Sequence, residues 1–68
     1  MLITCLKTRR EAMGMTQGEL AKLVGVRRET IVHLENGKYN PSLKLAMDIA
    51  HVFSAAMEEL FSFSEDSE

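Results

Sequence analysis

Two short helical patterns joined by Gly25-Val26 constrain this sequence more than any other feature. The first begins at Thr16-Gln17-Gly18-Glu19, which fits a capping box. In such a box the threonine hydroxyl and the glutamate carboxylate satisfy free backbone amides at the start of a helix. Gly25 can take the positive φ that ends this helix. The second pattern runs from about Arg27 to Asn36, with Gly37 as its stop. Because the connection is short, the two helix axes are expected to cross steeply.

Three further helices are predicted around this pair, and no strand. Apolar spacing predicts a first helix from about Ile3 to Met13, with Gly14 after it. Ser42 can cap a fourth helix, which is expected to end near Ser54. That joint is weakly marked because neither Gly nor Pro lies there, and a short fifth helix follows it. The predicted fold class is therefore all-α, a compact five-helix bundle.

A length of 68 residues allows a single domain. We expect it to span residues 1–61 and to leave residues 62–68 as an acidic, frayed tail. A chain this short removes only ~60% of its extended surface from water, so its stability should be low. Cys5 is the only cysteine, and one thiol with two histidines does not supply the four ligands of a structural zinc site. The core is expected to be purely apolar, without disulfide, metal or cofactor.

The net charge of −2 conceals a division along the chain. Residues 1–44 carry all eight Lys and Arg against four acids, which gives +4, whereas residues 45–68 carry six acids and no Lys or Arg, which gives −6. This asymmetry indicates one surface that faces a polyanion and another that faces elsewhere.

The N-terminal apolar run is too short for a signal peptide, and about 18 consecutive apolar residues, as a membrane span needs, occur nowhere. A soluble, cytoplasmic protein that does not bind membranes is expected.

The first turn of the second helical pattern presents Arg27, Arg28 and Glu29. These side chains are candidates for contacts with DNA bases. Arginine can donate to both major-groove acceptors of guanine, and glutamate can accept a hydrogen bond from the amino group of cytosine. Each good contact favours the correct base over a wrong one by ~1–3 kcal/mol. His33 lies one helical turn beyond Glu29 and faces the same way. The alternative is a solvated helix face, in which Glu29 pairs with Arg28 or Lys22 and His33 meets only water.

Several short motifs, at consistent spacing over roughly residues 4–61, together resemble the Cro and phage-repressor (Xre) family of helix-turn-helix proteins. They are Arg10, Gly14, Thr16-Gln17, Glu19-Leu20-Ala21, Gly25-Val26, Ile31, Leu34-Glu35-Asn36-Gly37-Lys38 and Asn40-Pro41-Ser42. The resemblance implies a lambda-repressor-like domain that binds operator DNA as a homodimer, with residues 27–36 as the recognition helix in the major groove. It also implies a sequence-specific transcriptional regulator, expected to be a repressor.

The resemblance assigns roles to individual residues. A glutamine matching Gln17 sits at the phosphate backbone and can brace the recognition helix, and positions matching Asn36 and Lys38 approach phosphates. Base contacts come from positions matching Arg28, Glu29 and His33. An arginine matching Arg10 and a glutamate matching Glu35 form, in some members, a partly buried ion pair.

Arg27 departs from the family pattern, which often has Ser or Thr as the cap of the recognition helix. A backbone amide at the start of this helix, which the Ser or Thr side chain would otherwise cap, must then donate to water or to a phosphate. Helix N-termini favour anions and Arg27 adds a full charge, so a phosphate contact is expected there.

The apolar residues of the C-terminal part exceed what one small core can easily cover. Burial within one chain accounts for some of these residues, and Phe53, Met57, Leu60 and Phe61 are expected to line a two-fold dimer interface. Dimerisation sets two recognition helices ~34–36 Å apart on a palindromic site.

An enzyme is not expected. His33 and Glu35 lie two residues apart and face different sides of their helix, and the chain is too small to enclose a pocket. The alternative function is a protein-interaction module, such as an antitoxin, that uses the helix-turn-helix scaffold and the acidic C-terminal part to bind a protein partner.

Overall fold

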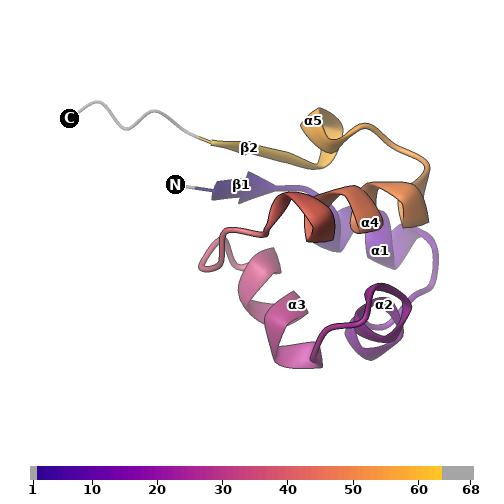
Figure 1. Cartoon of the computed structure of the whole chain (residues 1–68). Coiled ribbons are helices and arrows are strands. Elements are labelled where there is room, and N and C mark those ends of the chain that lie inside the picture. Colours follow the sequence, from indigo (N-terminus) through magenta and orange to yellow (C-terminus); the bar gives the residue numbers. More distant parts are fainter. Residues whose placement is uncertain (1, 64–68) are drawn as a thin grey trace.

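The computed structural model describes residues 2–63, which form a small helical domain with one strand pair (Figure 1). The prediction of five helices and of a lambda-repressor-like arrangement is confirmed for these residues. The prediction that no strand is present is wrong. The elements in order are β1 (Leu2–Thr4), α1 (Leu6–Ala12), α2 (Gln17–Val24), α3 (Arg28–Glu35), α4 (Leu43–Phe53), α5 (Met57–Leu60) and β2 (Phe61–Phe63).

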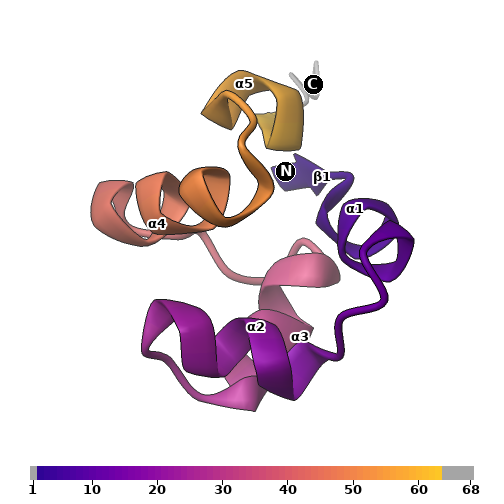
Figure 2. The same ribbon diagram turned by 90° about the vertical axis from the view of Figure 1, so that its right-hand side faces the viewer.

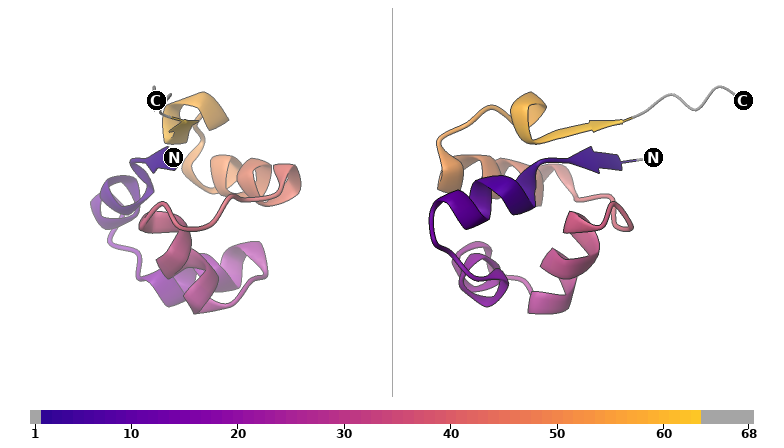
Figure 3. Two further views of the ribbon diagram at one scale, coloured as in Figure 1. Left: turned by 90° about the vertical axis from the view of Figure 1, so that its left-hand side faces the viewer. Right: turned by 180° about the vertical axis from the view of Figure 1, so that it is seen from behind.

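The two strands join the start of the described chain to its end. They pair antiparallel, with Leu2 opposite Phe63 and Thr4 opposite Phe61. Ser62 and Phe63, which we expected in a frayed tail, thus belong to β2, while residues 64–68 of that tail lie outside the described residues. Figures 1 and 3 show the strands side by side at the end of the domain farthest from α2.

The first helix begins three residues later than its apolar spacing predicts. Leu2 and Leu6 are both buried and lie four apart, which imitates a helical stripe. At the start of the chain the exposure of the side chains instead alternates from one residue to the next. Leu2 is 3% exposed and Ile3 51% exposed, as expected for a strand with one face on the core. The Thr4 hydroxyl accepts a hydrogen bond from the Leu6 amide at 3.0 Å, which satisfies a free donor at the start of α1.

A single apolar core holds the elements together. α4 lies between the α2–α3 pair and α5, and α1 closes one side (Figures 1 and 2). Among the described residues, no helix is long and apolar enough to cross a membrane. Six large side chains in this core are fully buried: Leu6, Leu20, Ile31, Leu34, Ile49 and Leu60.

The joint between α4 and α5 forms without glycine. α4 ends as predicted at this joint, where Ser54 takes a left-handed conformation with φ of 51°. The Ala55 amide donates to the Ala50 carbonyl at 3.0 Å, so the last turn of α4 is closed. No hydroxyl caps α5. Its first free amide, at Ala56, donates to the Glu59 carboxylate at 3.0 Å.

Candidate nucleic-acid interface

The start of α2 and its turn into α3 have the geometry that the sequence predicts. The Thr16 hydroxyl accepts from the Glu19 amide at 3.0 Å, and the Glu19 carboxylate accepts from the Thr16 amide at 2.8 Å. Gly25 ends α2 with φ of 75°, and the Val26 amide donates to the Ala21 carbonyl at 3.0 Å. This compact turn fixes the direction in which α3 leaves α2.

The outer face of α3 is polar and exposed. Ile31 and Leu34 are buried, so the helix packs through one side only. Arg27 precedes the helix in an extended conformation and provides no side-chain cap, as its sequence departure indicates. The charged and polar residues expected to contact DNA from this helix and the residues after it are all exposed: Arg27, Arg28, Glu29, His33, Asn36 and Lys38.

A buried ion pair ties α3 to α1. The Arg10 Nε donates to Glu35 Oε2 at 2.6 Å, and the two side chains are 8% and 3% exposed. A second guanidinium nitrogen donates to Glu35 Oε1 at 3.2 Å, so the pair is bidentate. The hydrogen bond to Glu35 raises the pKa of Arg10 above its ordinary value, although burial opposes the shift. The guanidinium therefore stays charged although it is buried.

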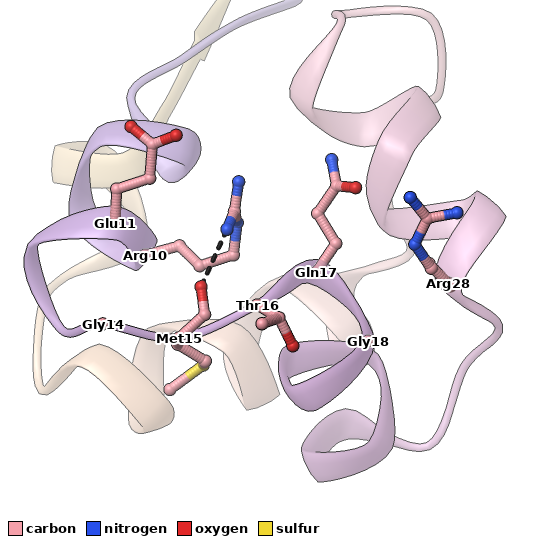
Figure 4. Close-up of a pocket in the computed structure, with 8 residues that line it drawn as sticks. All are labelled: Arg10, Glu11, Gly14, Met15, Thr16, Gln17, Gly18 and Arg28. Carbon is pink, nitrogen blue, oxygen red and sulfur yellow. Dashed lines mark hydrogen bonds between the residues drawn. The ribbon is translucent and has the colours of Figure 1, made fainter.

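Two further contacts extend this pair to α2. The Gln17 Nε2 donates to Glu35 Oε1 at 3.0 Å. The Arg10 Nη1 donates to the carbonyl of Met15, just before α2, at 2.7 Å, as Figure 4 shows. Sequence reasoning did not anticipate the Met15 contact because it involves a backbone carbonyl that no side-chain pattern reveals. Glu35, Arg10 and Gln17 form a network that holds three helices in one arrangement.

Arg28 and Gln17 lie on facing sides of one open depression. Figure 4 shows that Gln17 enters the depression from the start of α2, next to Gly18, and that Arg28 enters it from the start of α3. The guanidinium of Arg28 therefore lies beside the first turn of α2 as well as at the start of α3. A duplex that contacts one of these two helix starts would lie close to the other.

The four residues expected at a dimer interface are placed differently from one another. Phe53 and Leu60 are buried within the chain, which leaves them almost no surface for a partner. Met57 and Phe61 are half-buried and line an apolar groove between α4, α5 and β1. Leu43, which sequence reasoning missed, lines the same groove and is 67% exposed.

Comparison with known proteins identifies the chain. Residues 6–60 match the helix-turn-helix family. An uncharacterised HTH-type transcriptional regulator of Archaeoglobus fulgidus is 64% identical over 63 residues, which cover 93% of this chain and 89% of that protein.

Among solved structures, the restriction-modification controller protein C.AhdI of Aeromonas hydrophila is similar with a TM-score of 0.73 and 31% identity, over 79% of this chain and 82% of that one. Hydroxypropylphosphonic acid epoxidase of S. wedmorenis is 36% identical with a TM-score of 0.72. That match covers 79% of this chain but only 29% of the epoxidase. The chain thus belongs to the Xre-like helix-turn-helix family and is a DNA-binding transcriptional regulator.

Proposed function

We propose that this protein is a repressor that inserts α3 into the major groove of operator DNA. The observation that carries the proposal is the buried Arg10–Glu35–Gln17 network, because it fixes α3 against α1 and α2 while leaving the outer face of α3 free. A recognition helix must be held at a defined angle for its side chains to meet base edges. The relatives, which are transcriptional regulators, support a cytoplasmic protein without catalytic activity.

Base contacts are assigned to three residues on the first two turns of α3. Arg28 suits guanine, Glu29 suits the amino group of cytosine, and His33 lies one turn farther along the same exposed face. Their exposure is compatible with these roles because none of the three is used in the core.

Phosphate contacts are assigned around the edges of the same surface. Arg27 lies at the uncapped start of α3, and Asn36 and Lys38 lie at its other end. Gln17 gives one amide hydrogen to Glu35, so its second amide hydrogen remains to meet a phosphate. Together these residues would position the duplex on both sides of α3.

Salt dependence tests DNA binding before the operator is known. With two cationic phosphate contacts in each copy of a dimer, from Arg27 and Lys38, log K should fall linearly with log salt concentration, with a slope of about −3.6. The measurement is fluorescence anisotropy of a labelled mixed-sequence duplex between about 50 and 200 mM salt. Absence of duplex binding at the lowest salt concentration would reject the proposal.

The groove lined by Met57 and Phe61 is proposed to bind a second copy of this chain. A hollow and a projecting apolar side chain, Leu43, occur on one face, which is the requirement for a self-complementary two-fold contact. Met47, one helical turn after Leu43, is also exposed. α5 lies on the side of α4 opposite α3, so a contact between copies there would leave both recognition helices accessible (Figure 1).

Leu43→Glu should convert the dimer to a monomer without unfolding the chain. At a two-fold contact the new carboxylate would be buried near the same carboxylate of the second copy, which is unfavourable. The matched control is Leu23→Glu on α2, since Leu23 is 62% exposed and does not line this groove. Sedimentation equilibrium should give twice the chain mass for the wild type and Leu23→Glu, but the chain mass for Leu43→Glu. Equal masses for the two variants would contradict this interface.

A further inference from the structure

Gly37, two residues after the end of α3, touches the backbone of β1. Its φ of 75° favours glycine, but space is also lacking: a Cβ built there would lie 2.8 Å from the Leu2 carbonyl oxygen. Gly14 and Gly25 have similar φ values of 67° and 75°, yet a Cβ at either would meet no atom within 4 Å. Gly37 is thus distinguished from them by its contact with the strand rather than by its conformation.

The strand is held firmly on its other sides. The side chain of Leu2 is buried in the core, and its backbone is paired opposite Phe63. Just beyond β1, the Cys5 amide donates to the Leu60 carbonyl at 3.2 Å. The Leu2 carbonyl therefore cannot retreat from Gly37 without disturbing either the core or the strand pair.

The end of α3 is equally well defined. The Gly37 amide donates to the Leu34 carbonyl at 3.1 Å, and the Lys38 amide donates to the His33 carbonyl at 2.9 Å. These two bonds close the helix in a Schellman arrangement. Consequently, the position of Gly37 against β1 determines where the backbone of its neighbours Asn36 and Lys38 lies.

We propose that the β1–β2 pair is a positioning element for DNA binding, acting through the contact between Leu2 and Gly37. The strands touch no DNA themselves in this proposal. They fix the end of the recognition helix so that Lys38 meets a phosphate. The inference rests on the proposed function, specifically on the phosphate contact assigned to Lys38.

The test compares Gly37→Ala with Gly14→Ala, which introduces the same left-handed strain where no atom is close. Both are titrated with a mixed-sequence duplex at several salt concentrations, at a temperature where circular dichroism shows each variant fully folded. Loss of one cation–phosphate contact should make the slope of log K against log salt less steep by about 0.9 per copy. We expect this change for Gly37→Ala and no change for Gly14→Ala. A purely structural role for Gly37 would lower the melting temperature without altering the slope.

Two further variants keep the test decisive if Gly37→Ala folds poorly. Ser62→Pro interrupts β2 opposite Ile3 without touching Gly37, and it should reduce the slope by the same amount. Lys38→Ala should reduce the slope in the wild type but cause no further reduction when added to Gly37→Ala or Ser62→Pro.

The outcomes separate the two proposals. If Lys38→Ala lowers the slope but Gly37→Ala and Ser62→Pro do not, positioning by the strands is wrong and the proposed function stands. If Lys38→Ala leaves the wild-type slope unchanged, the phosphate contact and the positioning proposal both fail. If the wild type binds no duplex, the proposed function itself fails.

Discussion

Replacing Glu35 by alanine is expected to destabilise this domain by about 3–5 kcal/mol, because the buried guanidinium of Arg10 loses its charged partner. A domain of this length has a total stability of only ~3–10 kcal/mol. The variant should therefore melt roughly 12–40 °C below the wild type, or be largely unfolded at room temperature. Thermal denaturation followed by circular dichroism measures the difference.

Two control variants distinguish the effect of burying the Arg10–Glu35 pair from the effect of removing a carboxylate. Asp48→Ala removes a carboxylate from the Lys44–Asp48 pair, whose N–O distance is 2.8 Å but which lies at the surface. Its loss should cost less than about 1 kcal/mol. The double variant Arg10→Met with Glu35→Leu should regain most of the stability, because neither charge then remains buried. A melting temperature of Glu35→Ala equal to that of Asp48→Ala would show that the Arg10 pair contributes no more than a surface pair.

Replacing Arg28 by alanine is expected to weaken binding to the preferred duplex by ~1–3 kcal/mol for each half-site, or about 30- to 25,000-fold for a dimer that loses both contacts. Arg28 is exposed and lies in the first turn of α3, so its truncation should leave the melting temperature unchanged. Binding to mixed-sequence duplex should fall much less, since base contacts supply discrimination while phosphate contacts supply general affinity. Competition between the two duplexes at fixed salt measures the selectivity directly.

Lys7→Ala is the matched control for Arg28→Ala, because it removes an exposed cation from α1, outside the helix-turn-helix unit. It should preserve selectivity. Arg28→Lys should restore only part of the selectivity, because a lysine keeps the charge but lacks the two-pronged geometry that matches guanine. Equal losses on both duplexes would instead make Arg28 a phosphate contact, a role that its position beside the first turn of α2 also permits.

The elements predicted best from sequence are those specified by local chemistry. The capping box at Thr16 and the stop at Gly25 each depend on residues within a few positions of one another, so the α2–α3 pair could be placed from the sequence alone. The Arg10–Glu35 contact joins residues 25 apart, and no local rule reveals it; its expectation came from the family resemblance.

The elements that sequence reasoning missed depend on distant parts of the chain. β1 and β2 are three residues each and pair across almost the whole sequence, so neither strand has a local signal strong enough to outweigh the helical spacing of Leu2 and Leu6. Ser54 adopts the left-handed conformation in place of glycine. The apolar C-terminal residues could not be divided between core and surface, because burial of Phe53 and Leu60 follows from how α4 and α5 pack.

Selection of bound sequences from a pool of random duplex DNA shows whether two copies of α3 read bases in successive major grooves. We expect enrichment of a two-fold symmetric site whose half-sites are centred about 10–10.5 base pairs apart. Selection with Arg28→Ala should relax the preference at one position in each half-site. A pool that remains random, although the folded protein binds duplex at low salt, would contradict base reading by α3.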